Sequence, residues 1–225
     1  MSRSNQPPGG PGSWGEVAQH LRETARLRAH LPPERVALQR EVLRLAGRVA
    51  ARRVLDVGCG TGALARQLAA DGAEVIAIDV SPAAVHAANH DAKESGETPR
   101  PEFAVADLLA PTSLPAGPFE IVTCVLALHD SADPERALRA AAKLLHPRGR
   151  LVLAIAHPWL RDGGALPRPF ASLPALIGAL RAAGLRLVDA AEPEPPGADH
   201  GAPPHHLVIA AERASKRPRN RGTSR

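Results

Sequence analysis

A glycine-rich stretch at residues 54–65 decides the fold, and it reads VLDVGCGTGALA. The residues before the first glycine form a short apolar run, interrupted by Asp56, that predicts a buried strand. Glycines at positions 58, 60 and 62 allow the backbone to turn tightly and to approach a ligand closely. The residues after them have a helical pattern, so a helix N-terminus would face that ligand. The stretch therefore predicts a strand, a ligand-binding turn and a helix in direct succession.

Strands and helices alternate along the chain on either side of this stretch. Helices are predicted over residues 14–30, 34–50, 63–71, 81–95, 134–145 and 173–183. Strands are predicted over residues 53–57, 74–79, 102–106, 119–126, 150–156, 185–190 and 206–212. The alternation predicts a parallel sheet with helices on both faces, and the continuous apolar runs agree because such strands bury both sides.

The last two predicted strands have no helix between them. A polar, Pro-rich loop joins them, so they should pair as an antiparallel hairpin at one edge of the sheet. We therefore expect an α/β protein with a doubly wound, mainly parallel seven-stranded sheet (Rossmann-like), an antiparallel edge hairpin and an N-terminal helical cap.

A single domain accounts for most of the 225 residues. Residues 1–13 are rich in Pro, Gly and Ser and are expected to be disordered. The domain should cover residues 14–212, and a basic disordered tail should follow over residues 213–225. Within the domain we expect a helical cap over 14–50, a ligand-binding core over 51–158 and a last segment with the edge strands over 159–212.

The composition limits the chemistry of any site. Aromatic residues make up 2% of the chain and there is no tyrosine, so no site can use a phenolic hydroxyl. The two cysteines, Cys59 and Cys124, lie far apart in apolar stretches, which favours free thiols in a reducing cytoplasm over a disulfide. No hydrophobic leader opens the sequence, and no apolar run reaches the ~18 residues needed to cross a membrane. We therefore expect a cytoplasmic protein without a membrane segment.

The positive charge is concentrated in the tail. The formal net charge is +5, but residues 213–225 hold six of the 28 Lys and Arg residues and no acid. The remaining 22 basic residues face 23 acidic ones, so the folded body is about neutral. Such a body, poor in aromatic residues, argues against a nucleic-acid partner. A monomer and a homodimer both remain open.

Three acidic residues at predicted strand ends indicate which ligand the glycines bind. Asp79 ends the second strand, where a carboxylate can accept hydrogen bonds from ribose hydroxyls. Asp56 precedes the glycines and would repel a pyrophosphate but attract an ammonium group. Asp107 follows the third strand and can accept a hydrogen bond from an exocyclic amino group. A ligand with an amine, a ribose and an adenine but no phosphate is S-adenosylmethionine.

From Val54 to about Ala156 the sequence resembles the class I S-adenosylmethionine-dependent methyltransferases of the small-molecule type. The matching motifs are VLDVGCGTG at 54–62, VIAIDVSP at 75–82, FAVADL at 103–108, FEIVTCVLALHD at 119–130 and LLHPRGRLVLAIAHP at 144–158. The glycine spacing G-x-G-x-G also differs from the G-x-G-x-x-G of dinucleotide sites, which argues against a dehydrogenase. One departure is Glu120, where the family usually has Asp. It lies at the start of the fourth strand, away from the expected cofactor.

The resemblance implies cofactor roles for residues in each motif. These residues are Asp56, Gly58, Cys59, Gly60, Gly62, Asp79, Val80, Asp107, Leu108 and Val125. Asp56 and the glycine turn would hold the methionine part, and the backbone around Val125 would meet the ammonium group. Asp79 would bind the ribose, Val80 would pack on the adenine, and Asp107 with the backbone of Leu108 would read the adenine edge.

Two histidines follow the fourth and fifth predicted strands and are candidate catalytic bases. An imidazole at His129 or His157 could take the proton of a hydroxyl acceptor, since it titrates near neutral pH. The alternatives are that His129 orients the cofactor or caps the next helix, and that His157 is a hydrogen-bonding wall residue. We expect no metal, although His129, Asp130 and Asp133 together would offer one set of ligands.

By resemblance, the N-terminal helix and the segment after the fifth strand close the acceptor pocket. Candidate acceptor contacts are Trp14, Arg22, Trp159 and Arg168. The segment over 159–170 is short for the family, and the family's N-terminal tyrosine is missing. The site would therefore be more open, accept a larger substrate, or be completed by a partner subunit.

These features predict transfer of a methyl group from S-adenosyl-L-methionine to an oxygen or nitrogen of a small molecule, in secondary metabolism. Two alternatives remain. One is an RNA or protein methyltransferase, for which the basic tail would be an anchor. The other is a relative that binds the cofactor but catalyses another reaction, such as cyclisation, because a fold does not fix a function.

Overall fold

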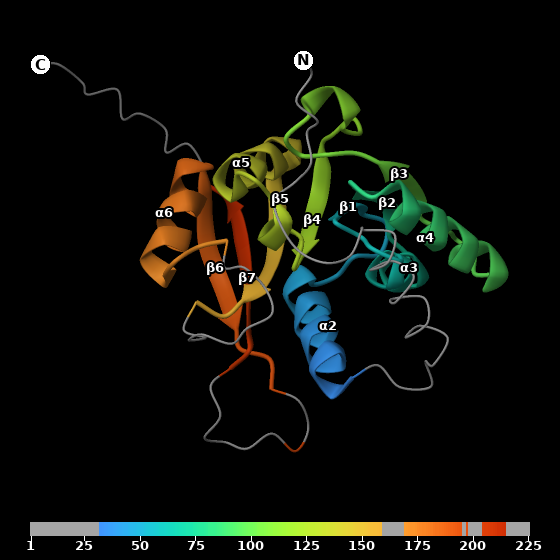
Figure 1. Cartoon of the computed structure of the whole chain (residues 1–225), viewed down its shortest axis with the longest axis horizontal. Helices are drawn as coiled ribbons and strands as arrows, with labels where there is room; N and C mark the ends of the chain where they lie inside the picture. The colour runs from blue at the N-terminus through green and yellow to red at the C-terminus, as the bar shows by residue number, and fades with distance from the viewer. Residues whose placement is uncertain (1–31, 159–168, 195–196, 198–203, 215–225) are drawn as a thin grey trace, which may run out of the picture.

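A seven-stranded sheet in the order β3-β2-β1-β4-β5-β7-β6 forms the centre of the computed structural model (Figure 1). The structure describes residues 32–158, 169–194, 197 and 204–214. The strands are β1 (Arg53–Val57), β2 (Glu74–Asp79), β3 (Glu102–Val105), β4 (Phe119–Val125), β5 (Leu145–Ala156), β6 (Leu185–Ala191) and β7 (His206–Arg213). The α-helices are α2 (Pro33–Ala46), α3 (Ala63–Ala70), α4 (Pro82–Glu94), α5 (Pro134–Leu144) and α6 (Leu173–Ala182). Two short 3-10 helices are η1 (Pro111–Ser113) and η2 (Leu128–Asp130).

The direction of the strands confirms the predicted fold class. Neighbouring strands among β1 to β5 pair in parallel. The strand β7 is antiparallel to both of its neighbours, β5 and β6. The antiparallel hairpin of β6 and β7 therefore closes one edge of the sheet, with β6 outermost.

Helices cover both faces of the sheet, as the apolar strands predicted. Figure 1 shows α3 and α4 beside β1 to β3, and α5 and α6 beside the other end of the sheet. Alternate strand residues face opposite layers. Val54 joins an apolar cluster with residues of α2 and α3, and its neighbour Leu55 joins a second cluster with residues of α5 and α6. Burial on both sides explains why the parallel strands carry almost continuous apolar sequence.

The helix predicted over 34–50 is shorter than expected. It ends at Ala46 because Gly47 adopts a positive φ of 73°, a backbone conformation that ends helices. This helix packs on β5 and β7 and forms the described part of the helical cap. The helix predicted over residues 14–30 lies outside the described residues.

The start of β5 differs from the predicted strand, which begins at residue 150 because Pro147, Arg148 and Gly149 are typical of a turn. The strand begins at Leu145, which pairs with Phe119, and the register then shifts so that Arg150 pairs with Ile121. The expected turn is therefore a bulge within β5. A Cβ at Gly149 would lie 2.9 Å from the carbonyl oxygen of Phe119, so this bulge needs glycine for its close approach to β4.

As in other open α/β sheets, the strand order points to a ligand crevice at the carboxyl ends of β1 and β4. The chain leaves β1 toward β2 on one side and leaves β4 toward β5 on the other. Loops that diverge in this way leave room for a ligand between them. Within the described part of the chain, no helix combines the length and the apolar character that crossing a membrane requires.

Candidate active site

The glycine turn after β1 has the tight geometry that its sequence predicted. The backbone N–H groups of Gly58 and Cys59 both donate to the carbonyl oxygen of Ile78, over 2.7 and 3.0 Å. Gly58 has a φ of +68°, and a Cβ there would lie 2.2 Å from the Cβ of Ala127 in the loop after β4. Glycine is thus required at position 58 both by backbone conformation and by this close approach.

Gly62 joins the turn to α3. It occupies the N-cap position of the helix with a φ of +80°. A Cβ there would lie 2.7 Å from the ring of Phe103. The third glycine therefore allows α3 to pack closely against β3.

Gly60 faces open space, in contrast to the other two glycines. Its φ is +56°, and no atom lies within 4 Å of where a Cβ would be. Its backbone N–H donates to Oδ2 of Asp79 over 2.9 Å, and Oδ1 of Asp79 accepts from the N–H of Ser81 over 2.9 Å. The partly buried carboxylate of Asp79 thus links the glycine turn to the start of α4. Each of its oxygens can still accept a hydrogen bond from a ligand, because a carboxylate oxygen has two lone pairs.

Asp56 is buried beneath the glycine turn. Its side chain is 2% exposed, and its Oδ1 accepts a hydrogen bond of 2.6 Å from the hydroxyl of Thr123. Its Oδ2 has no hydrogen-bond partner among the described residues. Burial raises the pKa of Asp56 to about 7; the Thr123 hydroxyl opposes this rise and the Asp79 carboxylate adds to it. The crevice thus contains a buried carboxylate oxygen that could accept a hydrogen bond from a cationic group.

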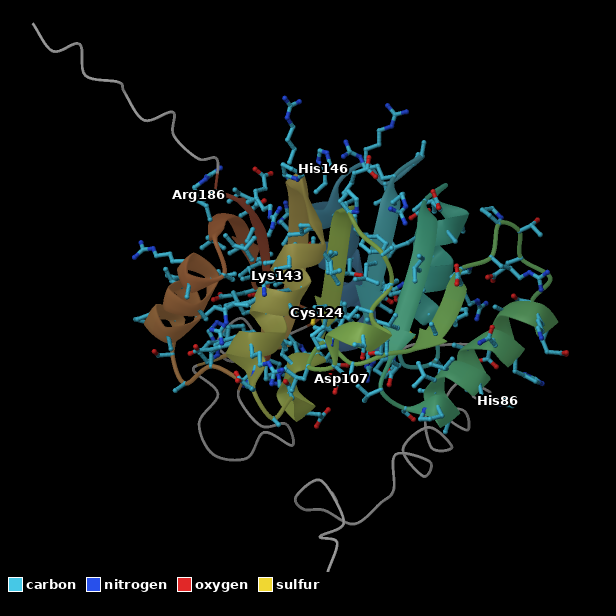
Figure 2. The ribbon with its side chains drawn as sticks, turned by 90° about the horizontal axis from the view of Figure 1, so that it is seen from above. His86, Asp107, Cys124, Lys143, His146 and Arg186 are labelled. Carbon is cyan, nitrogen blue, oxygen red and sulfur yellow. The ribbon has the colours of Figure 1, made fainter. Side chains whose placement is uncertain are left out.

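The ends of β2 and β3 form the other side of the crevice. Val80 directly follows β2 and is 55% exposed, an unusual exposure for a large apolar residue at a strand end. Asp107 is half-buried, and its Oδ1 accepts from the N–H of Leu109 over 2.8 Å. The side chain of Leu108 packs in the apolar core. Figure 2 shows Asp107 at the end of the sheet opposite from His146 and Arg186.

The two cysteines are free thiols in apolar surroundings. Cys59 is half-buried in the glycine turn and Cys124 is buried in β4. Burial, together with the nearby Asp56 carboxylate, raises the pKa of both thiols, so they stay protonated at neutral pH. Their environment suits packing rather than nucleophilic chemistry.

His129 uses both ring nitrogens within the chain. The N–H of Ala156 at the end of β5 donates to Nε2 over 2.8 Å. Nε2 is therefore unprotonated and Nδ1 carries the hydrogen, which it donates to the carbonyl oxygen of Leu126 over 3.0 Å. Burial lowers the pKa of His129, which favours this neutral form. The ring thus connects the carboxyl ends of β4 and β5, and these hydrogen bonds favour a positioning role over general base catalysis.

His157 lies at the end of β5 and pairs with a carboxylate from another strand. Its side chain is fully buried, and its Nε2 lies 3.0 Å from Oε1 of Glu192, directly after β6. Its backbone N–H donates to the carbonyl oxygen of His205 over 2.9 Å. A carboxylate partner can hold an imidazole in one tautomer and orientation, as in other acid–base sites. His157 is thus a buried histidine paired with a carboxylate, and its role as a base stays a prediction.

Asp133, the third residue of the alternative metal set, has a structural partner. Its Oδ1 accepts from the N–H of Arg136 over 2.9 Å and caps the first turn of α5. Because both nitrogens of His129 are also occupied, this set does not form a metal site. Within the described ranges, no group of three or more His, Cys, Asp or Glu residues could hold a metal ion.

Comparison with known proteins identifies the domain. The family model of the methyltransferase domain matches residues 55–153, which include the glycine turn, Asp79, Asp107 and His129. Residues 55–153 therefore match a methyltransferase domain. This match supports the family predicted from the motifs.

Curated relatives match a little under half of the chain. A ubiquinone biosynthesis O-methyltransferase from Xanthomonas axonopodis pv. citri is 43% identical over 106 residues, which cover 47% of this chain and 43% of the relative. A protein of the same name from Aromatoleum aromaticum is 40% identical over 103 residues, covering 46% and 43%. The chain thus spans less than half the length of these relatives.

Solved structures extend the likeness of the fold over most of the chain. A SAM-dependent methyltransferase from Aquifex aeolicus has a TM-score of 0.67 at 21% identity, covering 88% of this chain and 97% of that one. Magnesium protoporphyrin IX methyltransferase from Synechocystis has a TM-score of 0.66 at 20% identity, covering 90% and 100%. At such identities the likeness shows the shared fold alone.

The predicted acceptor residues of the methyltransferase domain lie outside the described residues. These residues are Trp14, Arg22, Trp159 and Arg168. Their roles stay predictions. Glu120, the departure from the family pattern, accepts a hydrogen bond of 2.7 Å from the backbone N–H of Arg53 at the far end of β1. Its place away from the glycine turn agrees with the small effect expected of it.

Sequence reasoning missed two residues of the site. Thr123 binds Asp56, but this pairing follows only once β1 and β4 are known to be neighbours with Asp56 opposite Thr123. Glu192 follows β6 and pairs with His157, which follows β5, although β7 lies between these two strands in the sheet. No local motif marks either residue, although the strand order typical of the family would have pointed to Thr123.

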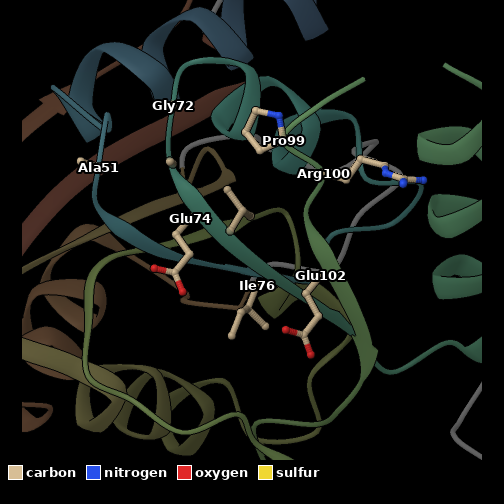
Figure 3. A pocket seen from close by; sticks show the side chains of 9 residues that line it. Ala51, Gly72, Glu74, Ile76, Pro99, Arg100 and Glu102 are labelled. Carbon is tan, nitrogen blue, oxygen red and sulfur yellow. The ribbon is translucent and has the colours of Figure 1, made fainter. Parts of the chain in front are cut away.

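A hollow at the opposite edge of the sheet is separate from this site (Figure 3). It lies at the amino ends of β2 and β3, and its lining includes Gly72, Glu74, Pro99, Arg100 and Glu102. The charged side chains that line it are exposed, whereas the crevice at the glycine turn contains the buried Asp56. The glycine turn therefore stays the predicted cofactor site.

Proposed function

We propose that the protein transfers a methyl group from S-adenosyl-L-methionine to a hydroxyl oxygen of a small molecule. The observation that carries the proposal is the crevice between β1 and β4. There the buried Oδ2 of Asp56, the open side of Gly60 and the carboxylate of Asp79 occur together. The curated relatives are named O-methyltransferases, which favours oxygen over nitrogen as the acceptor atom.

The residues of the crevice fit the parts of this cofactor. Asp56 and the glycine turn would hold the amino-acid part, and Asp79 would accept hydrogen bonds from the ribose hydroxyls. The exposed side chain of Val80 offers an apolar surface for the adenine, and the half-buried Asp107 offers an acceptor for its amino group. When bound, the cofactor supplies an electrophilic methyl group on a sulfonium. The protein then has to hold the acceptor in line with it.

His157 and Glu192 are the candidates to take the proton of a hydroxyl acceptor. His157 ends β5, one strand from β4 and the crevice, and Glu192 holds its Nε2 at 3.0 Å. The neutral ring of His129 would support the site by fixing the loops after β4 and β5. We assign base catalysis to His157 and positioning to His129.

The pathway and setting of the reaction belong to the same proposal. The relatives' names refer to ubiquinone biosynthesis and give no support to the secondary metabolism expected from the sequence. Acceptors of both kinds should therefore be tested. We place the protein in the cytoplasm as a monomer or homodimer, and we expect neither nucleic acid nor a membrane as its partner.

The test begins with binding and then measures transfer. Calorimetry should show that S-adenosylhomocysteine binds and that NADH does not. Asp79→Ala should weaken S-adenosylhomocysteine by roughly 10- to 100-fold, since charge-assisted hydrogen bonds contribute ~1.5–3 kcal/mol. Asp79→Asn is the matched control, because it keeps a carbonyl acceptor and should lose less. Unchanged affinity in a folded Asp79→Ala protein would refute the assignment of the cofactor.

Transfer is then measured with deuterated methyl cofactor against a panel of phenols, alcohols and amines. Mass spectrometry should find labelled ethers and an equal amount of S-adenosylhomocysteine. Labelled amines without ethers would overturn the choice of oxygen. Binding without transfer to any acceptor would favour a reaction of another type, and one solved structure of this fold is a cyclase, with a TM-score of 0.64 at 24% identity over 78% of this chain and 80% of that one.

A further inference from the structure

The buried Oδ2 of Asp56 is a polar atom without a partner at the base of the proposed cofactor site. Oδ1 accepts from the Thr123 hydroxyl at 2.6 Å, but among the described residues no hydrogen bond reaches Oδ2. An ionised carboxylate buried in this way is costly unless a cation or further donors compensate it. Among the described residues, the donor to this carboxylate is the Thr123 hydroxyl, and Oδ2 receives none.

No basic side chain from the neighbouring elements compensates Asp56. The elements packed on β1 are mainly β2, β4 and α3. The only ionisable residue of α3 is Arg66, which pairs with Glu97 at 2.6 Å. Near Asp56, β2 presents the acidic Asp79 and β4 presents the thiol of Cys124.

The remaining ionisable groups close to Asp56 are acidic or neutral as well. The thiol of Cys59, in the glycine turn, is protonated at neutral pH because burial raises its pKa. The other ionisable residues of β2 and β4 are Glu74 and Glu120, at the far ends of those strands. Among the described residues of β2, β4 and α3, Asp56 therefore faces the Asp79 carboxylate and no cationic group, which favours the protonated carboxyl group.

We propose that Asp56 carries a proton in the unliganded site and releases it when the ammonium group of the cofactor binds beside Oδ2. The O–H bond of the carboxyl group breaks, the proton passes to the buffer, and the carboxylate pairs with the ammonium. This inference rests on the proposed function, because the ammonium belongs to the proposed cofactor. It makes Asp56 the residue that selects an amine-bearing ligand.

The release couples cofactor affinity to pH. The pKa of Asp56 is raised to about 7 in the empty site and should fall when a cation neutralises the carboxylate. Binding must then displace a proton below pH 7 but not well above it. Affinity should rise about tenfold between pH 6 and pH 8, as proton linkage requires while the ligand keeps its ammonium group.

The experiment measures released protons by calorimetry of the full chain in buffers of different ionisation enthalpy. S-adenosylhomocysteine should release about 0.8 proton at pH 6.5 and less than about 0.1 at pH 8.5. The matched ligand is 5′-methylthioadenosine, which has the adenosine and the thioether but no ammonium. It should bind more weakly and release no proton at either pH. This comparison needs no variant.

Two pairs of variants assign the proton to Asp56. Asp56→Asn should abolish both the release and the rise in affinity with pH. Thr123→Val removes the hydroxyl that stabilises the carboxylate and should move the midpoint to higher pH, whereas Thr123→Ser should leave it in place. Circular dichroism confirms that each variant is folded.

The outcomes separate this inference from the proposed function. Binding of S-adenosylhomocysteine without proton release, or with equal release by 5′-methylthioadenosine or by folded Asp56→Asn, overturns the inference and leaves the cofactor assignment intact. Failure of S-adenosylhomocysteine to bind at any pH overturns both.

Discussion

Asp56 combines a proposed role in ligand binding with a cost for the stability of the folded chain. The carboxyl group is buried with one hydroxyl partner, so the folded protein binds its proton more tightly than the unfolded chain does. A group whose pKa is raised by folding loses its contribution to stability as the pH rises through that pKa. For Asp56 this window runs from its ordinary pKa of 3.8 up to about 7.

We therefore predict that Asp56→Asn stabilises the unliganded protein at pH 8. The wild type loses about 1.4 kcal/mol of unfolding free energy for each pH unit across the window, and the amide has no proton to lose. The gain should be a few kcal/mol at pH 8 and close to zero at pH 4, seen in melting temperatures at the two pH values. An equal change at both values would mean that the substitution acts through packing and not through the proton.

Many of the candidate site residues could be predicted from the sequence, because each of them lies in or beside a short motif. Asp56, the glycines and Asp79 stand next to strand ends, and strand ends are visible in apolar runs. The partner Thr123 depends on which strands are neighbours, and Glu192 depends on the path of the chain after α6. The sequence around Thr123 or Glu192 does not indicate either partner.

Two loops meet at the crevice between β1 and β4, and glycine is what allows them to meet. A side chain at Gly58 would collide with Ala127, whereas a side chain at Gly60 would face open space. Both residues have positive φ, so an L-residue at either pays a cost of about 1–2 kcal/mol for backbone conformation. The difference in unfolding free energy between alanine variants at the two positions therefore measures the contact between the loops.

We predict that Gly58→Ala destabilises the protein by several kcal/mol and that Gly60→Ala costs about 1–2 kcal/mol. Ala127→Gly removes the Cβ that lies 2.2 Å from the added methyl group and should partly rescue Gly58→Ala. Denaturant unfolding of the single and double variants measures the coupling. Strictly additive effects would show that the two loops do not touch.

The ends of β4 and β5 are joined by the ring of His129, and β5 continues into His157. Loss of His129 leaves the N–H of Ala156 and the carbonyl of Leu126 without their partner, a cost of about 1–3 kcal/mol for each group that stays buried. His157 has a carboxylate partner instead. Loss of His129 should therefore lower mainly the stability of the protein, whereas loss of His157 should lower mainly the turnover number.

We predict that His157→Ala lowers the turnover number on a hydroxyl acceptor by ~10²–10⁴ with little change in cofactor affinity. His129→Ala should lower the melting temperature and raise KM, with a modest loss of rate. Single-turnover transfer under saturating cofactor distinguishes the two patterns. If neither variant slows transfer more than about tenfold, alignment alone accounts for the rate.

The boundaries of the elements were less predictable than their order. The sequence of Pro147, Arg148 and Gly149 is typical of a turn, yet the parallel pairing of Leu145 with Phe119 extends β5 through it as a bulge. Tertiary pairing overrides local preference here. The order of strands and helices follows from apolar periodicity and was correct over the described residues.

At the scale of the whole molecule, the antiparallel strand β7 reverses the direction of the chain. Its first residue, His206, pairs with Ala156 near the crevice, and its last residue, Arg213, pairs with Leu185 at the opposite edge. Ala214 then donates its N–H to the carbonyl of Gly184 over 2.9 Å. Arg213 and Ala214, which were predicted to begin the basic tail, therefore belong to the domain.

We predict that a chain ending at Ala214 folds and turns over a small acceptor as the full chain does. The removed residues contain no apolar side chain and leave β7 intact. Melting temperature and turnover number should change little, whereas a chain ending at Leu207 should not fold because it lacks a strand of the sheet. Loss of activity on small acceptors after truncation at Ala214 would instead support the alternative of an anchored RNA or protein substrate.

Because β7 ends at the end of the sheet away from the glycine turn, its last residue is a suitable point for attaching a tag. A fluorescent reporter or an immobilisation tag fused after Ala214 would attach at the edge remote from Gly58 and Asp79. Surface-tethered protein should then present its crevice to the solution, which suits screening of acceptor libraries on a sensor chip.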